Sequence, residues 1–459
     1  MLNSSWKVFV LVGSVLTTLL LLQLVPPVSF LGLETRQVDM VGEVMNPPEK
    51  KPVAKKKNTP KSTAKEKRDN NVYQPEGVTL FEDFSKGEEG GLNHFLALLA
   101  DSLPDDRTVN IAYYGDSFIE GDILTADLRE MLQTRYGGGG PGWVEPGPNF
   151  GSFRPTVSVS WSNVAEHAVV NKGFIPALQG PSQRYYVLSR YAAFTAKGSS
   201  KYAHAAQWQR MHLFLRSQVS SSVMYGPSQD RMTVKTILPS DAVQTFVLNG
   251  ASRSVTCGFG ESPSNIQLLG LTLDAAKGIA LDNFSMRGIP GHSLAYMPLN
   301  TMQQIARYRP YDLVILHFGL NAVGAKSSQA EAEAYIGKMK QAVNHMREAC
   351  PGASFLIVSV SDRDQRSAQG IHTIPQVKQL VALQRSMAQQ LHVGFFNLFE
   401  AMGGEGSMAD FVNRGEANKD YTHLNFKGGK RLADLYYQAI LAGVENYKRR
   451  MDAEEGDDE

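Results

Sequence analysis

Hydrophobic and polar positions follow two different patterns along this chain of 459 residues. From about residue 279 onward, short apolar runs alternate with segments whose apolar residues recur every three or four positions. The runs predict strands at 279–286, 312–318, 354–360 and 393–398, and the periodic segments predict helices near 297–308, 329–348, 374–391 and 426–441. This alternation is typical of a parallel sheet with helices on both faces.

The same pattern is present earlier, in the stretch VNIAYYGDSFIEGD, which begins at Val109. Its apolar start predicts a strand that Gly115 breaks, and a helical pattern begins at Gly121. A strand that delivers a serine to a tight turn before a helix is how α/β hydrolases expose a nucleophilic hydroxyl. The spacing of Ser117 and Glu120 also fits a helix-capping box, so this stretch alone leaves a nucleophile and a helix cap both open.

Between residues 150 and 280 the pattern changes to alternating runs such as TVSVSW, RYYVLSRY and MHLFLRSQV, separated by Gly, Ser, Pro and Asn. Short strands with frequent turn signals predict an antiparallel sandwich or jelly roll. We therefore predict an all-β domain inserted into the α/β domain. Its aromatic residues fit either a buried core or a groove that binds a glycan: Trp161, Tyr185, Tyr186, Trp208 and Tyr225.

Residues 8–25 carry no charge and are followed by two prolines. As a helix they would be about 27 Å long, which is enough to cross a bilayer. A cleaved signal peptide is the competing interpretation, although no A-x-A-like site follows. We predict a membrane anchor at residues 1–28. The charges on its two flanks place the N-terminus in the cytoplasm and the rest of the chain outside it.

Composition then divides the remaining chain. Residues 29–77 are rich in Lys and Pro and predict a disordered linker, whose basic part fits a solvated spacer or contact with an anionic lipid or polymer. We predict the α/β domain in two parts, 78–149 and 281–447, with an acidic tail at 448–459.

The 46 basic and 45 acidic residues nearly balance, which argues against a nucleic-acid partner. The two cysteines, Cys257 and Cys350, form no metal or redox motif, and either two buried thiols or a pair remains open.

Three further stretches follow predicted strands, where sites of parallel α/β sheets lie. RGIPGHS contains Gly291, FGLNAVG contains Asn321, and DYTHLN contains Asp420 and His423 just before the last helix. Taken singly, they are compatible with a turn, a helix cap and a loop acid. Asp420 and His423 are three residues apart, so their side chains can meet. A serine with a paired histidine and aspartate is typical of nucleophilic catalysis.

The stretches YGDSFIEGD, RGIPGHS, FGLNAVG and DYTHLN resemble, in this order, the four blocks of the SGNH/GDSL hydrolase superfamily, over roughly 79–150 and 281–445. The resemblance implies a flavodoxin-like three-layer sandwich with a parallel sheet. It implies Ser117 as the nucleophile, His423 as the base and Asp420 as the residue that orients it. The N–H groups of Ser117 and Gly291 and the Asn321 amide would form the oxyanion hole.

The alanine after Asn321 and the β-rich insert further resemble peptidoglycan O-acetylesterases. The resemblance implies an esterase that removes O-acetyl groups from an envelope or extracellular glycan, with peptidoglycan favoured and without a metal or organic cofactor. We predict a single-pass protein of the inner (cytoplasmic) membrane, with its C-terminal domain in the periplasm or outside the cell. An O-acetyltransferase with the same residues and a non-catalytic glycan-binding protein remain alternatives.

Three other residues near these blocks are candidates for substrate binding. Trp143 ends the glycine-rich stretch GGGGPGWV, which predicts a loop at the rim of the site, since no Lys-Ser/Thr follows as a phosphate cradle requires. His292 and His317 flank block residues and are candidates either for substrate binding or for structural hydrogen bonds.

Overall fold

The computed structural model describes residues 72–86, 91–148, 153–261, 263, 265–322, 324–368 and 370–457, and two short strands before them, β1 (Ser29–Phe30) and β2 (Leu33–Glu34). The chain divides into two units, Met1–Arg68 and Asp69–Glu459. In the first unit, β1 and β2 pair in antiparallel fashion. The predicted membrane helix at 8–25 and most of the predicted linker at 29–77 lie outside the described residues. No helix within the described ranges is long and apolar enough to cross a membrane.

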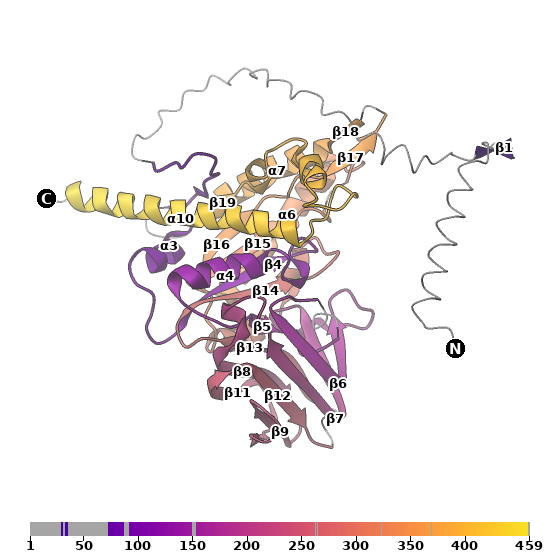
Figure 1. The fold of residues 1–459 in the computed structure, drawn as a ribbon, viewed down its shortest axis with the longest axis vertical. Helices are drawn as coiled ribbons and strands as arrows, with labels where there is room; N and C mark the ends of the chain where they lie inside the picture. The colour runs from indigo at the N-terminus through magenta and orange to yellow at the C-terminus, as the bar shows by residue number, and fades with distance from the viewer. Residues whose placement is uncertain are drawn as a thin grey trace, which may run out of the picture. The chain divides into compact units, whose positions relative to one another are not determined.

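The second unit contains a six-stranded sheet in the order β14-β4-β15-β16-β19-β3 (Figure 1). Its strands are β3 (Glu82–Asp83), β4 (Thr108–Gly115), β14 (Gly278–Ser285), β15 (Leu313–His317), β16 (Ser354–Val358) and β19 (Gly394–Phe396). Five are parallel, as the alternating pattern predicts, and β3 adds an antiparallel edge. Every residue of the five parallel strands is buried, which explains their continuous apolar runs.

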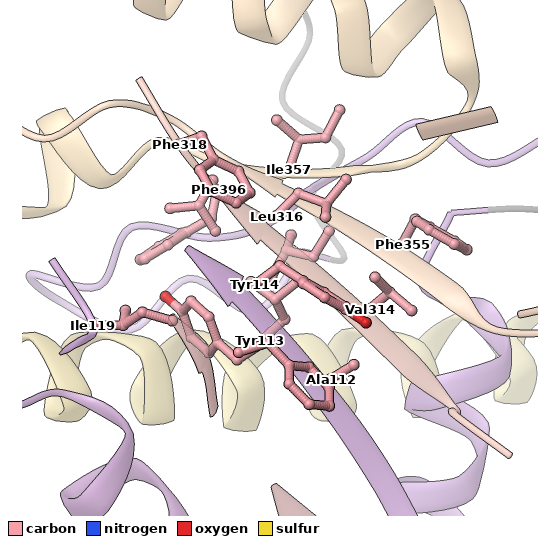
Figure 2. Packing of buried hydrophobic residues seen from close by; sticks show 14 of the residues in the cluster. Ala112, Tyr113, Tyr114, Ile119, Val314, Leu316, Phe318, Phe355, Ile357 and Phe396 are labelled. Atoms are coloured by element: carbon pink, nitrogen blue, oxygen red, sulfur yellow. The ribbon is translucent and has the colours of Figure 1, made fainter. Parts of the chain in front are cut away.

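Helices cover both faces of this sheet: α3 (Asn93–Ala100), α4 (Thr125–Tyr136), α5 (Leu299–Ala306), α6 (Gln329–Ala349), α7 (Pro375–Leu391), α8 (Leu398–Ala401), α9 (Ser407–Asn413) and α10 (Phe426–Asp457). Successive side chains of a strand point to opposite faces. In β4, the Tyr113 hydroxyl donates to Tyr436 of α10 at 2.6 Å, whereas Tyr114 lies near Cys350 at the end of α6. Figure 2 shows both tyrosines among buried side chains of β15 and β16. The fold is therefore the predicted three-layer arrangement.

The C-terminal helix departs from the prediction. Residues 448–457, predicted as part of an acidic tail, continue α10. This segment contains no proline and is rich in good helix formers (Lys, Arg, Met, Ala and Glu), so its composition does not end the helix.

A second sheet of nine antiparallel strands is formed by β5 (Gly142–Val144), β6 (Val157–Ala168), β7 (Arg184–Gly198), β8 (Trp208–Ser217), β9 (Ser221–Gly226), β10 (Thr233–Ile237), β11 (Ser240–Ser252), β12 (Ser254–Phe259) and β13 (Ile266–Asp274). The long strand β7 pairs with β6 along one edge, and with β12 and then β13 along the other. Side chains from both branches fill one core, as in a sandwich. Because β5 pairs with β13, this sheet begins upstream of residue 150.

Burial separates the two interpretations of the aromatic residues in this sheet. Tyr185, Tyr186, Trp208 and Tyr225 are buried, whereas Trp161 is 36% exposed. Four of the five therefore belong to the core, and Trp161 alone retains an exposed ring. Both cysteines are buried and unpaired, in agreement with the interpretation as buried thiols.

Candidate active site

Ser117 lies in the turn that follows β4 and is partly buried. A side chain at Gly115 would come within 2.9 Å of Ile119 and 3.1 Å of the His317 carbonyl, so the turn requires glycine there. A short 3₁₀ helix, η1 (Glu120–Asp122), comes next. Ser117 is thus presented at the carboxyl edge of the sheet, as its sequence predicts.

The helix predicted to begin at Gly121 begins instead at Thr125. Gly121 and Asp122 both have a φ of 62°, a left-handed conformation that interrupts the helical pattern. Leu124 is the N-cap of α4, and no side chain caps it. The interpretation of Ser117 as a helix cap is therefore wrong.

Buried charges hold the chain immediately after Ser117. The Asp122 carboxylate is fully buried and accepts hydrogen bonds from Arg129 at 3.2 Å and Arg154 at 3.0 Å. Burial alone would raise the pKa of Asp122, but the two guanidinium groups lower it below its usual value. Thr156 and Asn283 also donate to this carboxylate. These contacts connect η1 to β14 and to the chain that leads into β6.

Asp116 connects the serine turn to Asn321. Its carboxylate is 1% exposed and accepts from the Phe118 N–H at 3.0 Å and from the Asn321 amide at 2.9 Å. Burial raises the pKa of Asp116 to about 6. The predicted Asn321 is therefore brought to the turn that carries Ser117.

Gly291 occupies a position that only glycine fits. Its φ is 96°, and a Cβ there would lie 2.6 Å from the ring of Phe318, which follows β15. It is the N-cap of a 3₁₀ helix, η4 (His292–Tyr296). The loop after β14 thereby approaches the end of β15 closely enough to bring the second and third blocks together.

Asp420 and His423 form a hydrogen-bonded pair. His423 Nδ1 lies 2.7 Å from Asp420 Oδ2, and the His423 N–H donates to Oδ1 at 3.0 Å. Partial burial acts to raise the pKa of Asp420, but these hydrogen bonds hold it below its usual value. His423 also contributes to the electrostatics of Asp116, and Gly429 in α10 packs against the Ile123 carbonyl. The pair therefore lies at the same edge of the sheet as the serine turn.

The structure separates the three candidates for substrate binding. Trp143 is fully buried, stacks on Phe214 with centroids 5.5 Å apart and donates to Glu145. The prediction that it lies in a rim loop and stacks on a sugar is wrong, because Gly270 leaves room for the ring to pack between the nine-stranded sheet and Phe284 of β14. His317 is also buried, 3.1 Å from the Tyr113 hydroxyl, and its pKa is lowered to about 3 by burial, so it is structural. His292 remains partly exposed.

Sequence reasoning missed the polar residues that support the site. Asp122, Arg129 and Arg154 are brought together by the fold, and no sequence motif joins them. Asp116 lies within the first block, but its neighbour Asn321 is 205 residues away. In the part of the chain that the structure describes, no three His, Cys, Asp or Glu side chains converge as metal ligands would.

Comparisons with known proteins relate this chain to a family of acylhydrolases and to a solved fold. Residues 254–431 match the model of the GDSL-like lipase/acylhydrolase family. A solved peptidoglycan O-acetylesterase is 22% identical, with a TM-score of 0.66, over 79% of this chain and 99% of that chain. This likeness shows a shared fold.

Two family two carbohydrate esterases match more weakly. The enzyme from Cellvibrio japonicus is 10% identical, with a TM-score of 0.24, over 64% of this chain and 99% of that chain. The enzyme from Clostridium thermocellum is 9% identical, with a TM-score of 0.27, over 62% and 99%. No curated protein matches the chain by sequence.

Proposed function

We propose that this chain is a carboxylic ester hydrolase of the SGNH/GDSL type and that it removes O-acetyl groups from a glycan, with peptidoglycan as the favoured substrate. The observation that carries the proposal is the pairing of His423 with Asp420 at 2.7 Å, at the sheet edge that also presents Ser117. A serine, a base and a residue that orients the base are the parts that acyl transfer requires.

In the proposed reaction, the His423 Nδ1–H donates a hydrogen bond to Asp420, which keeps this proton on Nδ1 and leaves Nε2 free to accept the proton of the Ser117 hydroxyl. The Ser117 oxygen attacks the acetyl carbonyl, and the protonated His423 then donates to the departing sugar alcohol. Water, activated by the same histidine, releases acetate and restores the serine.

The negative charge on the carbonyl oxygen requires donors that are already in place. We assign this role to the N–H groups of Ser117 and Gly291 and to the Asn321 amide. That amide donates to Asp116 at 2.9 Å and, at a longer 3.4 Å, to the Ile289 carbonyl, and these contacts fix its orientation. We assign the hydrogen that faces Ile289 to the substrate oxygen, which would replace this long contact. Each such donor contributes about 3 kcal/mol to transition-state stabilisation.

The similarity to a peptidoglycan O-acetylesterase supports the choice of substrate. The match covers 79% of this chain, a larger share than the residues outside 142–274 make up, so it includes part of the segment that forms the nine-stranded sheet as well as the α/β part. A glycan with O-acetyl groups is therefore the substrate class we propose.

The decisive experiment measures acetate released by the unit that begins at Asp69, which forms one compact body. O-acetylated peptidoglycan and acetylated xylan are the two substrates, and Ser117→Ala is the control. We expect release from peptidoglycan by the wild type and none by the variant. Release from xylan alone would replace peptidoglycan as the substrate, and hydrolysis of neither would overturn the proposal.

We also propose that residues 1–28 anchor the protein in the inner membrane and that its catalytic unit acts outside the cytoplasm. The uncharged stretch at 8–25 supports this proposal. Protease added to spheroplasts of the source cell should cleave the segment 29–77 and release the catalytic unit. Protection that persists until the inner membrane is broken would contradict this orientation.

A further inference from the structure

A cavity of about 430 Å³ lies beside the Asp420–His423 pair. Three segments line it: the loop after Asn321, the hairpin of β17 (Asp364–Ser367) and β18 (Gly370–Thr373), and the turn that carries Asp420. The lining residues are Ala325, Arg363, Asp364, Gln365, Arg366, Ile374, Lys419, Asp420, Tyr421 and Thr422. Apart from Asp420, none of them takes part in the proposed ester chemistry.

The acidic groups of this cavity are already engaged in internal hydrogen bonds. Asp364 is 3% exposed and accepts from the Ala409 N–H at 2.7 Å, and its other oxygen lies 3.1 Å from the Thr373 hydroxyl, whose single hydrogen it shares with Asp362. Asp420 accepts from the side chain and the backbone of His423. Neither carboxylate is directed at a ligand in the cavity.

Two of the basic side chains that line the cavity, in contrast, make no internal hydrogen bonds among the described residues. Arg366 and Lys419 are exposed, and neither side chain makes an ion pair or hydrogen bond with another described residue. Arg363 is more fixed, because its guanidinium donates to the Leu320 carbonyl at 3.2 Å. The cavity therefore presents positive charge to solvent within reach of the proposed reaction centre.

The walls of this cavity are preorganised. The Thr373 hydroxyl donates to Asp362 at 2.8 Å and accepts from the Gly406 N–H at 2.8 Å, which fixes the base of the hairpin. The Asp364 N–H donates to the Tyr421 carbonyl at 3.1 Å and joins the hairpin to the turn that carries Asp420. Binding of a ligand here would therefore require little ordering of the backbone, and the ordering cost would fall on the exposed side chains of Arg366 and Lys419.

We infer that this cavity binds a carboxylate carried by the acetylated glycan, so that the enzyme selects acidic over neutral glycans. The inference rests on the proposed function and narrows its substrate class. Guanidinium groups bind carboxylates in bidentate geometry, and an ammonium adds a second, less directional attraction. A neutral polymer such as xylan lacks the group that Arg366 and Lys419 would contact.

The test uses the full chain and the double variant Arg366→Gln/Lys419→Gln. Lys235→Gln, an exposed position on β10 of the nine-stranded sheet, is the matched control. O-acetylated peptidoglycan fragments are supplied with free carboxylates or with the same carboxylates blocked as methylamides. For the wild type we expect kcat/KM to be about tenfold higher on the free-carboxylate form, mainly through KM.

The double variant should lose most of this preference, and Lys235→Gln should retain it. The preference of the wild type should also weaken as salt is added. If the two forms are equivalent for the wild type, or if the double variant keeps the full preference, the inference is overturned.

A second measurement does not depend on the proposed deacetylation. Unacetylated peptidoglycan fragments with free carboxylates should competitively inhibit hydrolysis of 4-nitrophenyl acetate by the wild type, and the double variant should need about tenfold more fragment. If the fragments inhibit the wild type more strongly than the double variant, but no glycan releases acetate, the proposed function is contradicted and carboxylate binding in the cavity is supported. If acetate is released from a glycan, but the fragments inhibit the wild type and the double variant equally, the proposed function is supported and the inference that the cavity binds a carboxylate is overturned.

Discussion

The two halves of the candidate active site are held in place by opposite means. Behind Ser117, the side chains of Asp122, Arg129 and Arg154 are only 0–3% exposed, and both guanidinium groups donate to the Asp122 carboxylate. On the other side, the Asp420 and His423 side chains are 48% and 43% exposed. One half depends on charges buried in the fold, and the other depends on hydrogen bonds within a single turn.

This difference predicts how each half fails. A buried charge is tolerated only while its partners are present, because removal of water costs several kcal/mol per ion. Changes behind Ser117 should therefore reduce the stability of the fold. Changes at the exposed pair should reduce activity and leave stability nearly unchanged, because water replaces a lost contact there.

The largest effect is expected from Ser117→Ala. It should lower hydrolysis of 4-nitrophenyl acetate by about three orders of magnitude or more. Since the serine caps no helix, the melting temperature should stay within about 2 °C of the wild type. Retained activity with a much lower melting temperature would show that the serine is structural.

Asp122→Ala should lower the free energy of unfolding by about 3 to 5 kcal/mol, because it leaves Arg129 and Arg154 buried without their carboxylate. Urea denaturation of the Asp69–Glu459 unit measures this loss. The matched control is Asp105→Ala, whose side chain is 94% exposed and pairs only with Lys277, with an expected change of about 0.5 kcal/mol or less. Similar losses in both variants would remove the distinction between buried and exposed charges.

Asp420→Asn should lower kcat on the small ester by about 1,000-fold or more, because the amide no longer favours the His423 tautomer that accepts the serine proton. The unfolding free energy should change by about 0.5 kcal/mol or less, since the side chain is 48% exposed. A stability loss as large as that of Asp122→Ala would contradict the proposed contrast between the two halves.

Asp116 provides a pH test of the buried half. An acid with a pKa of about 6 in the folded protein, raised by burial, binds its proton more tightly when folded than when unfolded. Its contribution therefore stabilises the fold at low pH and is lost as the pH rises from about 4 through 6. Relative to Asp116→Asn, the wild type should lose about 2 kcal/mol across this interval. Parallel stability profiles for the two proteins would show that the carboxylate does not titrate there.

The sequence carries the pattern of the α/β fold and the order of the site residues, because both are local. Continuous apolar runs predict β15 and β16, and a turn of four residues joins Asp420 to His423. The contacts of Arg154 with Asp122 and of Asn321 with Asp116 cross from one element to another and have no characteristic spacing. Trp143 shows the same limit of sequence-based prediction. An aromatic residue after a run of glycines is compatible with a surface loop and with a buried strand, and only the contacts with other elements show that Trp143 lies in a buried strand.

The smallest effect concerns the nine-stranded sheet. Arg154, just before β6, donates to Asp122, so the sheet supports the Ser117 half of the site, and it could in addition bind the polymeric substrate. If the sheet also holds a polymer, its exposed aromatic residues should matter for long substrates only. Trp161 and Tyr191 are 36% and 57% exposed on β6 and β7.

Replacement of both Trp161 and Tyr191 with Ala should lower the ratio of acetate release from polymeric glycan to hydrolysis of 4-nitrophenyl acetate by about threefold to tenfold. Val234→Ala, at a 62% exposed position on β10, is the control. Hydrolysis of the small ester, which has a single ring and no glycan chain, should be unaffected if these two rings serve only to hold a polymer. Equal losses on both substrates would mean that the sheet acts through Arg154 and Asp122 as a support for the Ser117 half. An unchanged ratio with full activity on both would exclude these two rings from polymer binding and leave the buried charges as the sheet's connection to catalysis.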